Sequence, residues 1–185
     1  GTPEWIAADL IAQAEHDPDA RAILLTPSKR LANAVAAECA RQLPERGPAR
    51  VALQRNGGIV LTRSLVEAVA ICERIAPEHA VCDDERVAAR LRSAGTVFVG
   101  SSSAQALGDY VTGSNHVLPT NGWARSRGGL SAADFVRVST VQRITLRGLR
   151  TIGPAAVALA NAEGLSGHAA SIARRMSREG RQNRP

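Results

Sequence analysis

Hydrophobic residues along the chain gather into short unbroken runs, separated by longer stretches in which they recur every three or four positions. The runs are Ala22–Thr26, Gly58–Thr62 and Thr96–Gly100. Each has the length of a strand that is covered on both faces, and the periodic stretches between them have the length of helices. This alternation predicts an α/β fold with a partial doubly wound, Rossmann-like parallel sheet.

The periodic stretches carry start and stop signals of helices. Thr2, Pro3 and Glu4 favour a helix start, and that helix should reach about His16. Ser64 and Glu67 form a capping-box pattern that opens a helix to about Ile75. Further helices are predicted over 27–43, over 83–94 and, shorter, from about Ser103.

The pattern changes after residue 135, where strands and helices no longer alternate. Residues 141–146, VQRITL, suggest one more strand, and two alanine-rich helices are predicted near 147–161 and 166–177. We therefore expect two domains: residues 1–135 as the second part of a Rossmann-like catalytic domain, and residues 136–185 as a helical C-terminal appendage that packs on a partner subunit.

Charge and cysteine usage narrow the classes of function. The 185 residues carry a formal net charge of +6, which raises a nucleic-acid-binding module as an alternative. The basic residues are spread along the chain except for 173–184, which is interpreted as a helix end and a solvated tail without interleaved aromatic residues. Three dispersed cysteines argue against a disulfide framework. No apolar run is long enough to span a bilayer and the N-terminus has no signal-peptide pattern, so a cytoplasmic location without membrane contact is expected.

Each of the four histidines has a carboxylate or amide residue nearby in sequence. The pairs are Gln13 with His16, Glu78 with His79, Asp109 with His116, and Glu163 with His168. Imidazole and carboxylate groups are ordinary zinc ligands, and an adjacent Glu-His pair can divide acid–base work. Any one of these histidines, taken alone, fits an ordinary surface or core position better than a functional one, and it is the recurrence of the pairing at all four that favours a site.

Four strings of the chain are specific enough to indicate a family: DLIAQAEHDPDA (9–20), IAPEH (75–79), GDYVTGSNHVLPT (108–120) and AEGLSGHAASI (162–172). They resemble histidinol dehydrogenase, a zinc-dependent family of histidine biosynthesis. They occur in the family's order and with roughly its spacing, and the likeness extends over nearly all of the chain.

The resemblance implies a role for each matching residue. Gln13, His16 and Asp109 match zinc ligands, and His168 matches the ligand that comes from the other subunit of a domain-swapped homodimer. Glu78 and His79 match the catalytic acid–base pair. The substrate, L-histidinol, would be held by these same side chains together with His116 and Glu163, and would be oxidised through histidinal to L-histidine with two NAD.

The chain also departs from the family's pattern. It is less than half as long as family members, and the region that supplies most NAD contacts would precede Gly1. No G-x-G-x-x-G motif occurs, so the NAD-binding residues stay unassigned. The segment after His79 is more polar than usual and slightly shortened. Three hypotheses follow: a truncated or split histidinol dehydrogenase, a non-catalytic dimeric remnant of that family, and a basic nucleic-acid-binding module.

Overall fold

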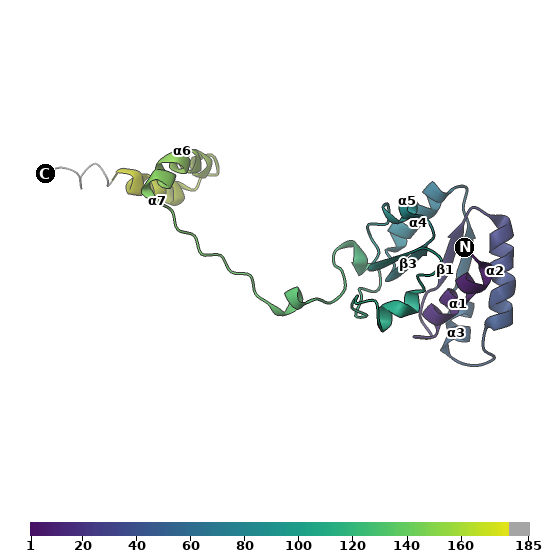
Figure 1. The fold of residues 1–185 in the computed structure, drawn as a ribbon. Helices are drawn as coiled ribbons and strands as arrows, with labels where there is room; N and C mark the ends of the chain where they lie inside the picture. Colours follow the sequence, from purple (N-terminus) through teal and green to yellow (C-terminus); the bar gives the residue numbers. More distant parts are fainter. Residues whose placement is uncertain (178–185) are drawn as a thin grey trace. The chain divides into compact units, whose positions relative to one another are not determined.

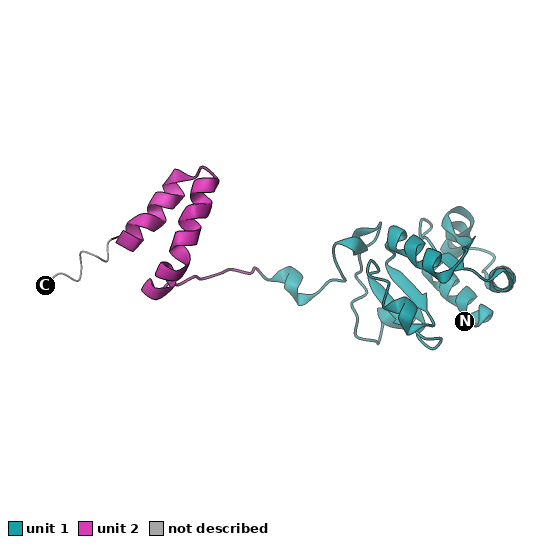
Figure 2. Ribbon diagram, turned by 90° about the horizontal axis from the view of Figure 1, so that it is seen from above, with its two compact units in different colours: residues 1–136 teal, residues 137–185 magenta. Residues whose placement is uncertain are grey.

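The computed structural model describes residues 1–177, which form two compact units, residues 1–136 and residues 137–177 (Figures 1 and 2). The first unit contains all the described strands and most of the described helices. The second is a pair of helices. The basic tract 173–184 reaches beyond Ser177, so its last part lies outside the described residues.

The helices and strands of the first unit alternate for most of its length. In chain order they are α1 (Pro3–Ala14), β1 (Ile23–Thr26), α2 (Lys29–Gln42), α3 (Pro48–Asn56), β2 (Gly58–Leu61), α4 (Leu65–Ile75), β3 (His79–Cys82), α5 (Glu85–Ala88), β4 (Thr96–Val99), and the 3₁₀ turns η1 (Gln105–Asp109), η2 (Trp123–Arg125) and η3 (Ala132–Phe135).

The described strands form two parallel pairs. β1 pairs with β2, and β3 pairs with β4 so that His79 lies opposite Thr96 and Val81 opposite Phe98. Parallel strands joined through helices confirm the predicted α/β class. The pairing also places His79 and Phe98 on the same face of the β3–β4 pair, because side chains two residues apart point to the same side.

Small side chains build the core of the first unit. α1 packs against α2 and α3, and the buried cluster there consists of alanines, of which Ala14 and Ala52 are completely buried, surrounded by partly buried leucine and isoleucine side chains. Since alanine has little volume to bury, helices can approach closely there, and the near absence of aromatic residues is compatible with a packed interior.

One of the two predicted helix caps forms a side-chain hydrogen bond, at Ser64, and Ser28 caps α2 in addition. The Ser28 and Ser64 hydroxyls accept hydrogen bonds from the backbone N–H groups of Leu31 and Glu67, as N-cap residues do. The Glu67 carboxylate accepts from the N–H of Arg63, one residue before the cap. Thr2 caps α1 without a side-chain hydrogen bond.

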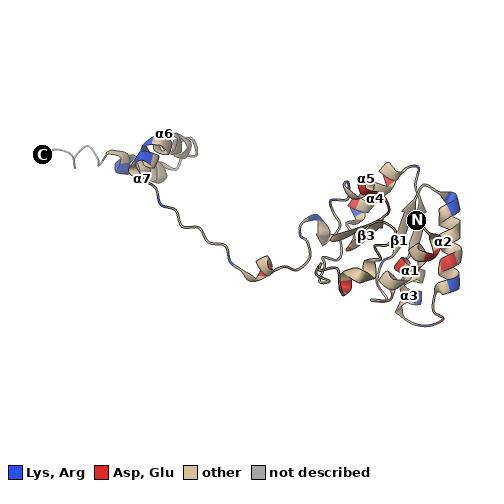
Figure 3. Cartoon of the chain, in the orientation of Figure 1, with Lys and Arg blue, Asp and Glu red and all other residues tan. Residues whose placement is uncertain are grey.

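Charged residues of both signs lie on the helices of the first unit (Figure 3). Some of them pair locally: Arg41 lies 2.7 Å from Glu38 and Arg63 lies 3.0 Å from Glu67. A nucleic-acid-binding surface needs positive charge gathered on one face. The mixed distribution over this unit therefore does not favour the nucleic-acid alternative.

Some sequence-based predictions of secondary structure are wrong. Residues 141–145 form no strand, since no described strand pairs with them. α5 ends at Ala88 instead of continuing to Ala94. The end of α1 at Ala14 agrees with the prediction within two residues, and His16 lies just beyond the helix. α3 and β3 were not predicted from the sequence.

The surface of β2 and the start of α4 is unusually apolar. Val60, Leu61, Leu65 and Val66 are 38–58% exposed. We call these four residues the β2–α4 apolar patch. Within the described residues, β2 has only β1 beside it, so its other edge is open.

The second unit is a helical hairpin of α6 (Leu146–Ala162) and α7 (Ser166–Ser177), which pack against each other. Gly164 makes the turn with φ of +73°. Both predicted helices are confirmed within one or two residues. None of the described helices is long and apolar enough to cross a membrane.

Candidate active site

The chain segments that follow α1 and α4 supply four residues of the site. Gln13 lies in the last turn of α1, and His16 follows two residues after that helix ends. α4 ends at Ile75, and the left-handed conformation of the next residue, Ala76 (φ 50°), redirects the chain so that Pro77 and Glu78 lead into β3 at His79.

The polar loop that follows β4 is anchored at both ends. η1 ends at Asp109, and the loop returns to the body at Pro119, which is buried. A Cβ added to Gly95 would lie 2.7 Å from the Glu78 carbonyl oxygen and 3.2 Å from Pro119 Cδ. Pro119 therefore lies next to Gly95 and close to the backbone of Glu78, which places the end of the loop beside β3.

The Gln13 side chain joins both members of the predicted acid–base pair. Its Oε1 lies 3.0 Å from Nδ1 of His79, and its Nε2 donates to Oε2 of Glu78 at 3.5 Å. Because a carboxylate can only accept hydrogen bonds, the NH₂ group of Gln13 faces Glu78, and the amide oxygen of Gln13 faces the imidazole of His79. An amide oxygen can only accept, so His79 carries its proton on Nδ1 and has its lone pair on Nε2.

His16 and Asp109 form the second pair of the site. Nε2 of His16 lies 3.6 Å from Oδ2 of Asp109, and the side chains are 51% and 11% exposed. The histidine therefore faces water, whereas the carboxylate is held in the protein surface.

The two pairs are neighbours, as their effect on His79 shows. The pKa of His79 is below its ordinary value, chiefly because burial disfavours the charged imidazolium. The Glu78 and Asp109 carboxylates raise this pKa and His16 lowers it, without reversing the effect of burial. His79 is consequently neutral at neutral pH, the state that a proton acceptor requires.

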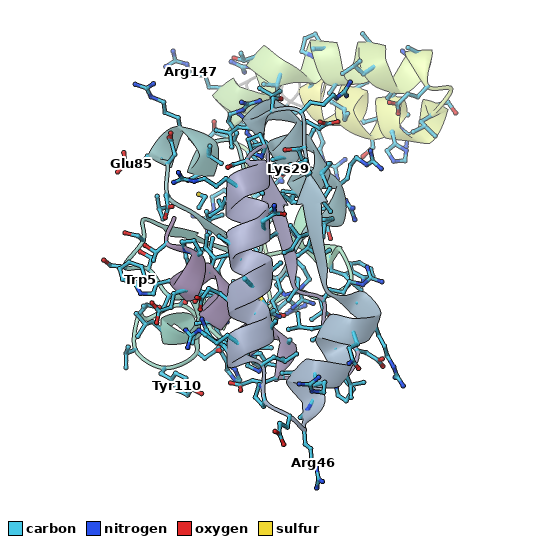
Figure 4. The ribbon with its side chains drawn as sticks, turned by 90° about the vertical axis from the view of Figure 1, so that its right-hand side faces the viewer. Trp5, Lys29, Arg46, Glu85, Tyr110 and Arg147 are labelled. Atoms are coloured by element: carbon cyan, nitrogen blue, oxygen red, sulfur yellow. The ribbon has the colours of Figure 1, made fainter. Side chains whose placement is uncertain are left out.

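A cavity of about 580 Å³ lies next to this cluster. Asp109 lines it from one side and His116 from the loop, with Ser114, Asn115 and the η3 turn completing the wall. Tyr110, which follows Asp109 directly, lies at the surface with 82% exposure (Figure 4). The cavity thus joins a predicted zinc ligand to a predicted substrate-binding histidine.

Glu163 and His168 belong to the second unit. Glu163 ends α6 and His168 lies in the first turn of α7, and both are exposed. The structure thus brings together Gln13, His16, Glu78, His79 and Asp109, places His116 beside the cavity, and leaves Glu163 and His168 on the surface of the hairpin.

The donor atoms of the first unit suit zinc in their chemistry. No cluster of three His, Cys, Asp or Glu side chains able to hold a metal occurs among residues 1–177. His16 and Asp109 supply one imidazole nitrogen and one carboxylate oxygen, and the amide oxygen of Gln13 has a second lone pair besides the one facing His79. Ligands that share a tetrahedral zinc lie about 3.4 Å apart at zinc–ligand distances of about 2.0–2.1 Å, close to the separation of this pair.

Comparison with known proteins identifies the family. The family model for histidinol dehydrogenase matches residues 1–176. The chain belongs to the histidinol dehydrogenase family. It is 46% identical to histidinol dehydrogenase of Cereibacter sphaeroides over 182 residues and 45% identical to that of Halobacterium salinarum over 184 residues.

A solved structure agrees with this assignment. The crystal structure of histidinol dehydrogenase from Elizabethkingia anophelis matches 97% of this chain with a TM-score of 0.86 and 35% sequence identity. The predicted resemblance and the fold class are thereby confirmed. The chain spans 42% of the length of that protein and of the Cereibacter relative, and 43% of the Halobacterium relative.

Two residues that shape the site were not predicted from the sequence. Phe98 lies in β4 with its ring centroid 5.7 Å from that of His79. Gly108, just before Asp109, contacts the same ring so closely that an added Cβ would lie 2.6 Å from Phe98 Cζ. The only signal in the sequence was that Phe98 is one of two phenylalanines, placed in an otherwise aliphatic strand.

Proposed function

We propose that this chain carries the metal-binding and acid–base side of a zinc- and NAD-dependent oxidation of L-histidinol, through histidinal, to L-histidine. The observation that supports this most is the convergence of Gln13, His16, Glu78, His79 and Asp109 from separate segments of the first unit. Because the chain covers less than half of its relatives' length, we propose that activity requires the remaining part of such a protein, including the NAD-binding residues.

The proposed zinc ligands are Gln13, His16 and Asp109 of one chain, with His168 of a second copy in a domain-swapped homodimer. His168 is exposed on the helical hairpin and therefore free to reach another molecule. When bound, zinc would orient the substrate by binding its imidazole and amino groups. His116 and Glu163 would hold the substrate from the cavity side and from the hairpin.

The acid–base pair has the arrangement that two successive oxidations need. The Nδ1–H of His79 donates to Gln13, so its free Nε2 would accept a proton as each hydride leaves the substrate carbon. Glu78, held by the same amide, would activate the water that hydrates the aldehyde, and the hydrate then loses the second hydride.

Zinc binding by the 185-residue chain tests the proposal. We expect the His16→Ala and Asp109→Asn variants to bind zinc at least about tenfold more weakly in a chelator competition assay. Glu45→Gln, an exposed carboxylate between α2 and α3, serves as the matched control and should bind like the wild type. Unchanged binding in both site variants would overturn the proposed metal site.

A second candidate function is a non-catalytic dimeric remnant of the family. Its supporting observation is that, among residues 1–177, no group of three His, Cys, Asp or Glu side chains is arranged so that it could hold a metal ion. The two candidates differ when the preceding part of a relative is supplied in trans: NADH formation from L-histidinol supports the enzyme, whereas zinc binding without turnover supports the remnant.

A further inference from the structure

Phe98 contacts both halves of the proposed site from one position. It lies in β4, its side chain is 7% exposed, and it is on the face of the β3–β4 pair that carries His79. The two rings are tilted by 49° at a centroid distance of 5.7 Å, an arrangement that aromatic pairs favour. The phenyl ring of Phe98, fixed in β4, therefore supports the imidazole ring of His79.

The same ring supports the turn that delivers Asp109. A Cβ at Gly108 would lie 2.6 Å from Cζ and 3.1 Å from Cε1 of Phe98, and the first distance is shorter than Cβ atoms adopt in proteins. Gly108 is buried, and its carbonyl oxygen accepts a weak hydrogen bond from the Ser114 hydroxyl at 3.4 Å. The backbone of η1 thus rests on the phenyl ring one residue before the carboxylate.

The end of α1 also links these two halves, because Gln13 and His16 lie there and η1 contacts both α1 and β3. His79 is held by Gln13 on one side, and Asp109 faces His16 on the other. Since packed interiors transmit small displacements, the size and flatness of the residue at position 98 determine how far the η1 backbone stands from the imidazole.

We propose that Phe98 is a positioning residue that sets the spacing between the acid–base residue His79 and the metal ligand Asp109. This proposal rests on the proposed function, because the roles of His79 in proton transfer and of Asp109 in metal binding are taken from it. It assigns no contact between Phe98 and substrate, and it explains why a glycine precedes Asp109.

The test compares Phe98→Leu and Phe98→Ala with Val35→Ala, a completely buried residue of α2, a helix that carries no site residue. Circular dichroism first establishes which variants are folded at the assay temperature. If Phe98→Ala is unfolded, the comparison is made with Phe98→Leu. We expect zinc affinity to fall about tenfold in the Phe98 variants, as for other residues that orient ligands, and to stay unchanged in Val35→Ala.

A second readout needs neither metal nor activity. In the metal-free chain, labelling with diethyl pyrocarbonate is followed by mass spectrometry at each histidine. The rate at His79 should rise severalfold in the Phe98 variants, while exposed His168 reacts as in the wild type and provides the internal control.

The outcomes separate the two proposals. If the wild-type chain binds no zinc, the proposed metal site fails, and the labelling rate of His79 alone decides the role of Phe98. If folded Phe98→Leu shows wild-type zinc affinity and wild-type labelling at His79, then Phe98 contributes only to stability and the positioning role is overturned.

Discussion

The amide oxygen of Gln13 lies 3.0 Å from Nδ1 of His79, while the amide nitrogen of the same side chain donates to Glu78. One residue at the end of α1 therefore orients both members of the proposed acid–base pair at the start of β3. Gln13 is also a proposed zinc ligand, so metal binding and proton transfer would share a single side chain.

The first prediction concerns the tautomer of His79. In the metal-free wild type, Nδ1 should carry the proton. In Gln13→Leu this preference should weaken by about fivefold, the effect of losing a hydrogen bond of about 1 kcal/mol. Nitrogen-15 chemical shifts of the imidazole, measured above neutral pH, report the tautomer directly, and exposed His116 serves as a control in the same spectrum. A His79 protonated on Nε2 in the wild type would contradict the arrangement.

The second prediction concerns the contact between Gly108 and Phe98. Gly108→Ala should lower the free energy of unfolding by about 1–3 kcal/mol, because the new methyl group overlaps the ring and forces the turn or the strand to shift. Urea unfolding measures this loss. Gly128→Ala is the matched control, since a Cβ added there would have nothing within 4 Å and its φ is not in the left-handed region. The control should stay within about 0.5 kcal/mol of the wild type, and an equal effect in both variants would count against the contact.

The third prediction tests whether two chains share a site. His16→Ala and His168→Ala chains, mixed in equal amounts and allowed to exchange subunits, should regain about a quarter of the wild-type zinc content. Half of the dimers are then mixed, and each mixed dimer has one site with both histidines intact. If His168 instead served its own chain, no intact site would form in the mixture and the zinc content would stay at the level of the separate variants.

The fourth prediction concerns pH and the loop that leads into β4. The Glu73 carboxylate accepts hydrogen bonds from the backbone N–H groups of Arg92 and Ser93 at 2.8 and 3.1 Å, and from the Ser93 hydroxyl at 2.9 Å. Burial acts to raise the pKa of Glu73, but these bonds and the charge of Arg92 outweigh it and lower the pKa below its ordinary value of 4.5. Its stabilising effect is therefore complete above pH 4.5 and is lost as the pH falls through the lowered pKa.

Glu73→Gln should consequently destabilise the protein by about 1 kcal/mol at neutral pH, a figure reduced for solvent screening. The difference from the wild type should vanish at acidic pH below the lowered pKa, where wild-type Glu73 is itself uncharged. Thermal melts at several pH values measure this dependence. Glu45→Gln, at an exposed position, is the control, and a difference that grows as the pH falls would refute the assignment.

The sequence predicts the helices and strands with strong local signals and fails where tertiary contacts decide. β1, β2 and β4 are apolar runs and were expected, whereas β3 begins with His79 and is a strand only because β4 pairs beside it. α3 is nine residues long and has no side-chain cap, so its sequence carries only a weak helix signal. Residues 141–145 have strand-like composition but no described partner strand, and pairing is what makes a strand.

The candidate site was predictable by motif and not by geometry. The resemblance located Gln13, His16, Glu78, His79 and Asp109, and the structure brings these five together. No pattern in the sequence indicated that Gln13 would bind both Glu78 and His79, nor that Phe98 would support both halves of the site. Those relationships depend on the distances between α1, β3, β4 and η1. The roles of zinc, NAD and the second subunit stay predictions.

The β2–α4 apolar patch has a practical consequence for handling the protein. It combines a strand edge open within the described residues with four exposed aliphatic side chains, which is the combination that promotes edge-to-edge aggregation. Purified samples of the 185-residue chain should become turbid with increasing concentration, and Leu61→Lys, in the middle of the patch, is the first substitution to try for improving solubility.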